Sequence, residues 1–114
     1  MKLQPAPFEM IKSGKKTIEL RLFDEKRQHI SAGDLIVFTN VLNGETLERI
    51  VLKLHKFDNF SELYSSLPLL KCGYTLDNVD NAHFSDMEQY YSVKEQDKYG
   101  VVGIELYKII DIAQ

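Results

Sequence analysis

The strongest constraint on the fold is an alternation of apolar and polar residues near the N-terminus. In the segment from 16 to 22, the apolar residues Ile18, Leu20 and Leu22 alternate with the polar residues Thr17, Glu19 and Arg21. A period of two predicts a β-strand with one buried face. Glu19 and Arg21 then share the other face, so the pattern places two opposite charges beside each other on a sheet.

The flanking sequence predicts short elements. Pro5, Pro7 and Gly14 are typical of a helix start and a helix end, and they frame a helix over 6–13. Gly33-Asp34 predicts a turn before an apolar strand over 35–38. Asn43-Gly44 is the preferred dipeptide of a two-residue hairpin turn, and it predicts a returning strand over 46–56.

The pattern changes between Asn59 and Tyr99. Three residues suited to capping a helix each stand three positions before a glutamate: Asn59 with Glu62, Ser85 with Glu88, and Ser92 with Glu95. This spacing predicts three short helices in an irregular insertion. A β-rich run from Val101 to Ile110 then predicts a last strand that closes the sheet.

These elements predict an α+β domain built on a small, mostly antiparallel sheet or barrel with peripheral short helices. The 114 residues contain no repeat, low-complexity stretch or linker, so we expect one domain over 1–114. A chain of this length can bury a sufficient core without disulfide or metal.

The net charge of −3 is unevenly distributed. Residues 1–30 carry seven basic and four acidic residues, a net of +3, whereas the remainder carries seven and thirteen, a net of −6. The acidic remainder argues against a surface that binds polyanions in general, but the basic segment allows a small site for one phosphate or nucleotide. The alternative is that these charges are simply solvated.

Several classes of site lack their residues. Cys72 is the only cysteine, and the three histidines have no ligand spacing, so the sequence predicts no metal site. Phosphate-binding glycine loops and nucleophile-elbow motifs are missing, and no cofactor is predicted. The lone cysteine and the start of the chain, which lacks a secretion signal, predict a cytoplasmic protein with no membrane partner.

One concentration of polar groups remains, the segment 14–21. Read alone, Glu19 and Arg21 could form an exposed ion pair with no function. The pattern Gly14-x-Lys16-x-x-Glu19-x-Arg21, together with Gly33-Asp34 and the run Tyr99-Gly100-Val-Val-Gly-Ile-Glu-Leu, nevertheless resembles the ASCH domain family, a relative of the PUA RNA-binding fold. The chain is similar to small stand-alone members of bacterial type. The resemblance implies a small β-barrel with a cleft lined by the motif, and RNA or a modified nucleoside or nucleotide as partner.

The resemblance also implies roles for motif residues. Some bacterial members of the family look like ribonucleases or like amidohydrolases of N4-acetylcytidine, and Lys16 corresponds to the lysine that the latter use in catalysis. Arg21 corresponds to the motif arginine, which would bind the ligand. Glu19 stands where those hydrolases have a threonine nucleophile, so it would act either as general base for water or as the group that fixes Lys16 and Arg21. Thr17 is two residues away, not at the matching position.

Strict alternation raises a geometric difficulty, because it puts Lys16 on the face opposite Glu19 and Arg21. The three side chains converge only if Lys16 precedes the regular strand and bends round its edge, and we adopt this as a hypothesis. Arg27, Asn40 and Tyr99 are further candidates for ligand binding. An acidic partner from the helical segment has no secure match, with Glu88, Glu95 and Asp97 as candidates.

The sequence therefore favours an RNA- or nucleotide-binding domain with a cleft around Lys16, Glu19 and Arg21. A hydrolase of N4-acetylcytidine-type nucleosides or RNA, with Lys16 and Glu19 as catalytic residues, is the first alternative. A protein-interaction or small-metabolite module is the second. The oligomeric state is not predicted.

Overall fold

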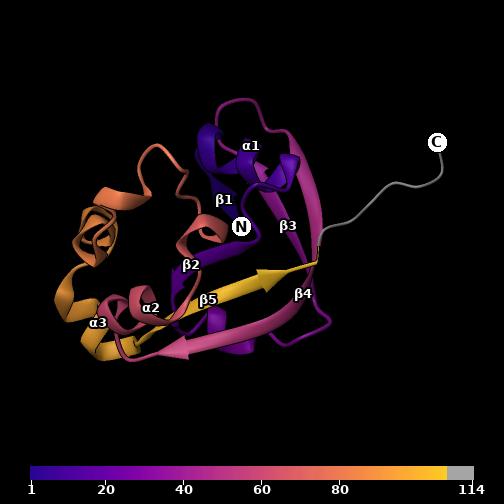
Figure 1. Ribbon diagram of the computed structural model, residues 1–114. Helices are drawn as coiled ribbons and strands as arrows, with labels where there is room; N and C mark the ends of the chain where they lie inside the picture. The colour runs from indigo at the N-terminus through magenta and orange to yellow at the C-terminus, as the bar shows by residue number, and fades with distance from the viewer. Residues whose placement is uncertain (108–114) are drawn as a thin grey trace.

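A computed structural model describes residues 1–107, and a five-stranded sheet with short helices forms its framework (Figure 1). The strands are β1 (Lys2–Leu3), β2 (Ile18–Leu22), β3 (Leu35–Asn40), β4 (Thr46–Phe57) and β5 (Val101–Leu106). The α-helices are α1 (Pro5–Ser13), α2 (Phe60–Ser66) and α3 (Val93–Tyr99). Four short 3₁₀ helices are η1 (Arg27–His29), η2 (Leu69–Lys71), η3 (Val79–Asn81) and η4 (Phe84–Gln89).

The sheet is curled and mostly antiparallel, with the strand order β1-β3-β4-β5-β2. Only β1 pairs in parallel, with β3. The long strand β4 joins the two halves, because it pairs with β3 near its start and with β5 near its end. A break in register between Val51 and Lys53 lies where β4 changes partner. The expected α+β fold is confirmed, and β1 and β2 are the two edges of a half-barrel.

Apolar residues form a core on each face of this sheet. The first core joins α1 to β1, β3, β4 and β5, with Leu3, Phe8, Ile11, Ile36, Phe38, Val51, Val102, Ile104 and Leu106 buried. The second core lies under the helical insertion, and includes Ile18, Leu20, Leu22, Phe60, Leu63, Cys72 and Val101. The apolar face of β2 therefore belongs to the second core. The expectation that only this face is buried is wrong, because Glu19 on the other face is buried and Arg21 is half-buried.

Glu19 and Arg21 face the first core. Their cross-strand partners on β5 are Ile104 and Val102, which belong to that core. Residues directly opposite in a sheet point to the same face, so the two charged side chains stand at the margin of the apolar interior.

The helical insertion, residues 59–99, covers β2 and β5 from one side (Figure 1). The expected caps of α2 and α3 are present, since Asn59 accepts from the amide of Glu62 and Ser92 from that of Glu95. The expected cap Ser85 is wrong: His83 caps η4, in a capping box with Asp86. Its imidazole accepts from the Ser85 amide.

Two further boundaries differ from expectation. The β3–β4 hairpin has a four-residue loop, residues 41–44, closed by the Asn40 amide on the Glu45 carbonyl at 2.8 Å. Among the described residues only glycines have positive φ, so Asn43 does not adopt the conformation that a two-residue turn requires. Strand β5 ends at Leu106, and the expected strand residues 108–110 lie outside the described residues.

Candidate functional site

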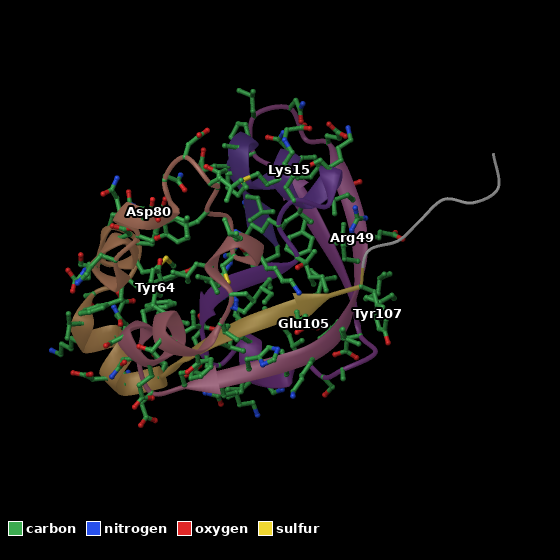
Figure 2. All side chains as sticks on the ribbon, viewed as in Figure 1. Lys15, Arg49, Tyr64, Asp80, Glu105 and Tyr107 are labelled. Carbon is green, nitrogen blue, oxygen red and sulfur yellow. The ribbon has the colours of Figure 1, made fainter. Side chains whose placement is uncertain are left out.

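Lys16 lies in the turn between α1 and β2. Helix α1 ends at Gly14, whose φ of 82° is the left-handed conformation of a helix cap. The Lys16 amide donates to the Met10 carbonyl at 3.0 Å, so the end of α1 holds the backbone before β2 begins at Ile18. Of the two adjacent lysines, Lys15 is exposed (Figure 2), whereas Lys16 turns into the protein.

Lys16 and Arg21 converge on the carboxylate of Glu19. The Lys16 ammonium lies 2.7 Å from Glu19 Oε1. Arg21 Nε donates to Glu19 Oε2 at 2.9 Å, and Arg21 Nη2 lies 2.9 Å from the same oxygen. Glu19 is 3% exposed. The hypothesis that Lys16 reaches round the strand edge is therefore confirmed. We call Lys16, Glu19 and Arg21 the ion triad.

The environment keeps Glu19 ionised. Burial alone would raise the pKa of its carboxyl, but the charges of Lys16 and Arg21 and their hydrogen bonds outweigh burial and lower it. A carboxylate with a lowered pKa and both oxygens engaged is a weak proton acceptor. This geometry suits Glu19 to holding the two cations more than to serving as a general base.

The triad stands where the two edge strands approach each other. Arg21 Nη2 also donates to the backbone carbonyl of Lys2 in β1 at 2.9 Å, so a side chain from β2 bridges to the opposite edge. The Met1 ammonium donates to the Val37 carbonyl, and its pKa is lowered by burial and by the nearby charges of Arg21 and Arg27. We call this region, formed by Met1, Lys2 and the triad, the seam.

The stem of Lys16 lies against the helical insertion. A Cβ atom at Gly73 would contact Lys16 Cδ at 3.4 Å and Nζ at 3.7 Å. The neighbouring Cys72 is buried, and burial raises the pKa of its thiol to about 11, although the Lys16 charge opposes that shift. Cys72 is therefore protonated at neutral pH and has no nucleophilic character.

The other candidates lie apart from the triad or are engaged elsewhere. Arg27 pairs with Asp24 at 3.0 Å. Asn40 is buried, and its Oδ1 accepts from the Leu42 amide at 2.9 Å, which supports the hairpin loop. Tyr99 lines a groove at the opposite end of β2 and β5 from Lys16. None of the three has a hydrogen bond or ion pair with the triad among residues 1–107.

The expected acidic partner of the triad is likewise not found among the three candidates in the insertion. Glu95 binds the Ser92 cap of α3, Asp97 lines the same groove as Tyr99, and Glu88 is exposed on η4. The acidic group of the site is Glu19 itself.

Sequence reasoning did not select three groups at or near the seam. The Lys2 carbonyl belongs to the two-residue strand β1, and Met1 directly precedes that strand. So short a segment cannot show a periodic pattern of apolar residues. Tyr91 stacks on Phe60 with ring centroids 6.0 Å apart, and burial raises its pKa while the charge of Arg21 opposes that rise. The sequence holds six tyrosines and no signal that separates Tyr91 from the others.

Side chains that ligate metals do not gather in the part of the chain that the structure describes. Residues 1–107 hold no group of three or more His, Cys, Asp or Glu side chains that could bind a metal ion. None of the helices in the same range is long and apolar enough to cross a membrane.

The chain is similar to known proteins in sequence and in fold. A family model described as "ASCH domain" matches residues 1–110. The crystal structure of hypothetical protein PH0355 is 34% identical, covers 96% of each chain and superposes with a TM-score of 0.78. The solution NMR structure of protein PF0455 from Pyrococcus furiosus is 32% identical, covers 93% of this chain and 92% of the other, and has a TM-score of 0.69.

A third structure shares the fold alone. The crystal structure of ASCH from Zymomonas mobilis is 16% identical, covers 95% of this chain and 65% of the other, and has a TM-score of 0.62. No curated protein matches the sequence.

Proposed function

Because this chain belongs to the ASCH domain family, whose members are in general thought to bind RNA, we propose that it binds RNA or a modified nucleoside at the seam. Lys16 and Arg21 contact the ligand, and Glu19 holds both cations in place. The observation that carries the proposal is the convergence of two cations on one buried carboxylate.

The charge balance at the seam supports this proposal. Lys16 and Arg21 stand against the single carboxylate of Glu19, which leaves a local excess of positive charge. Such a site attracts a phosphate or a carbonyl oxygen. The acidic remainder of the chain makes a long duplex a poor partner and favours a short or single-stranded ligand.

Arg21 has a hydrogen-bond donor that its contacts within the protein do not use. Arg21 uses Nε and Nη2 within the protein, and Nη1 donates to no group among residues 1–107. No fully buried side-chain nitrogen or oxygen in that range lacks a partner, so Nη1 is open to solvent. The Lys16 and Arg21 side chains are 11% and 16% exposed, which leaves a small face of each cation for a ligand.

The test is a titration of a fluorescently labelled, unstructured hexaribonucleotide at several salt concentrations. We expect Arg21→Gln to weaken binding about ten-fold and to reduce the salt slope by about 0.7 for each phosphate that the variant no longer neutralises. Lys12→Gln is the matched control. It removes one cation from an ion pair with Glu45 that is more exposed and lies outside the seam.

Equal binding by the wild type, Arg21→Gln and Lys12→Gln would place the RNA elsewhere on the surface and overturn the proposal. So would the absence of binding by the wild type to RNA or to nucleosides at micromolar concentration. Incubation with N4-acetylcytidine and with RNA tests the hydrolase alternative. Turnover by the wild type that disappears in Lys16→Ala and Glu19→Ala, at a temperature where circular dichroism shows both variants to be folded, would assign those residues catalytic roles.

A further inference from the structure

A concave feature lies at the other end of β2 from Lys16. It is a groove of about 460 Å³, formed where β4 ends, α2 begins, α3 ends and β5 begins. Its volume falls within the roughly 300–1,000 Å³ of sites that hold small organic ligands. It is larger than the small void of about 10 Å³ that Lys16 lines with Thr17 and Arg49.

Four charged side chains line the groove, Lys56, Asp58, Asp97 and Lys98. Within residues 1–107, none of them forms a salt bridge with a side chain of opposite charge. The groove thus has two cationic and two anionic side chains, and these four charges sum to zero. Two carboxylates repel a phosphate, so this balance favours an uncharged ligand with hydrogen-bonding groups of both kinds.

Aromatic rings orient the two lysines. The Lys56 ammonium lies 4.8 Å from the ring centroid of Phe23, and the Lys98 ammonium lies 5.0 Å from that of Tyr99. These contacts restrict the lysines by a cation–π attraction. The rings of Phe23 and Tyr99 therefore form an apolar wall of the groove and also contact the two ammonium groups.

Backbone contacts join the strands at the groove. The Phe23 amide donates to the Gly100 carbonyl at 3.0 Å, which ties the end of β2 to the start of β5. Gly100 has a φ of 71°, and a Cβ atom there would come within 3.0 Å of the Phe57 carbonyl oxygen. Only glycine fits this junction without strain, so the close approach of β5 to the end of β4 requires Gly100.

From these observations we infer that the groove is a subsite for an uncharged nucleobase or nucleoside unit, next to the seam on the path of a bound RNA strand. This inference rests on the proposed function. The carboxylates of Asp58 and Asp97 accept from exocyclic amines or ribose hydroxyls, and the ammonium groups of Lys56 and Lys98 donate to base carbonyls.

The position of Phe23 joins the groove to the seam. Phe23 is two residues after Arg21, and alternation puts both on the same face of the strand. Its packing against the first core agrees with that placement. Two residues of a strand separate the Cα atoms of Arg21 and Phe23 by about 7 Å, and on this spacing we place in the groove the nucleotide next to a phosphate at Arg21.

The test compares the mononucleotide 5′-CMP with the dinucleotides CpC and ApA, titrated by NMR on the full chain. The groove variant is Lys56→Met with Asp97→Asn, which removes one charge of each sign and leaves the net charge unchanged. The matched control is Lys53→Met with Glu48→Gln, which makes the same change at positions of β4 that do not line the groove.

For the wild type, we expect a dinucleotide to bind about ten-fold more tightly than 5′-CMP, and to shift the amide signals of Asp58, Asn59 and Gly100. In the groove variant, the dinucleotide should bind only as tightly as 5′-CMP, while 5′-CMP itself binds as before. The control should match the wild type.

Two results overturn the subsite and leave the proposed function standing. One is dinucleotide binding that is equal in the wild type and the groove variant. The other is a wild type that binds dinucleotide no more tightly than 5′-CMP, with both ligands weakened by Arg21→Gln. A wild type that binds neither ligand overturns both proposals.

Discussion

Removal of the Glu19 carboxylate should destabilise the protein more than most single substitutions. Glu19→Ala leaves two cations facing each other at positions where the Lys16 and Arg21 side chains are only 11% and 16% exposed. Loss of one partner from a buried pair costs about 3–5 kcal/mol. Because both cations keep some contact with water, we expect the lower end of that range, about 3 kcal/mol.

A second variant distinguishes two contributions to the free energy of unfolding: the destabilisation by buried charges that have lost their partner, and the stabilisation by the intact triad. Lys16→Met, Glu19→Leu and Arg21→Met together replace three charges by apolar side chains of similar length. Such a replacement is often neutral or stabilising, because no desolvated charge remains. We therefore expect the triple variant to recover most of the stability that Glu19→Ala loses.

The assay is equilibrium unfolding in urea, followed by circular dichroism. With a slope of about 1.5 kcal/mol per M for a chain of this size, a loss of about 3 kcal/mol moves the midpoint of Glu19→Ala down by about 2 M. Two results would refute the reasoning: a shift of Glu19→Ala below about 0.3 M, or a triple variant as unstable as Glu19→Ala. The second would mean that the triad stabilises the fold by more than the relief of buried charge.

Two other predictions follow from the pKa shifts. Since the pKa of Glu19 is lowered below its unfolded value of 4.5, its contribution is present above that value and is lost as pH falls through the lower pKa of the folded state. The difference in free energy of unfolding between the wild type and Glu19→Gln should shrink below pH 4.5, and a constant difference down to pH 2 would contradict this. Cys72, with a pKa of about 11 and a buried side chain, should react with a thiol reagent at pH 8 only as fast as the protein opens. Mild urea should accelerate that reaction, and rapid labelling of the native protein would show that the thiol is accessible.

Local patterns predicted the elements well where one face of the element is buried. The alternation of segment 16–22 identified β2 and its apolar face, because a slip of one residue would expose Ile18, Leu20 and Leu22. The caps at Asn59 and Ser92 predicted α2 and α3, since the capping bonds are local. The cap at Ser85 failed because the helical turn begins two residues earlier, with His83 as its cap, and the imidazole of His83 accepts from the amide of Ser85.

The features that the sequence did not predict depend on contacts between segments that are far apart in the chain. Strand β1 has two residues and exists because β3 supplies its partners, so no period could reveal it. The hairpin loop has four residues because the backbone pairing of Asn40 with Glu45 closes it, and the sequence shows only that Asn43-Gly44 can turn. In the same way, the motif predicted that Lys16, Glu19 and Arg21 act together, but not that Lys2 and Met1 stand beside them.

The seam links the architecture of the fold to its proposed ligand. A half-barrel whose edges do not pair leaves backbone groups of its edge strands without partners. Here the edges are joined by the Arg21 side chain, which reaches from β2 to the Lys2 carbonyl of β1, and not by a strand ladder. In a backbone ladder between the edges, the N–H groups that face the neighbouring strand would all be used in pairing. A guanidinium instead has five N–H groups, and those of Arg21 Nη1 remain open to solvent after the side chain bridges the edges. Glu19 is needed for this arrangement because it fixes the guanidinium in one orientation at the margin of an apolar core. The same three side chains thus close the sheet and leave a cationic surface at the closure, which is why we place the ligand there.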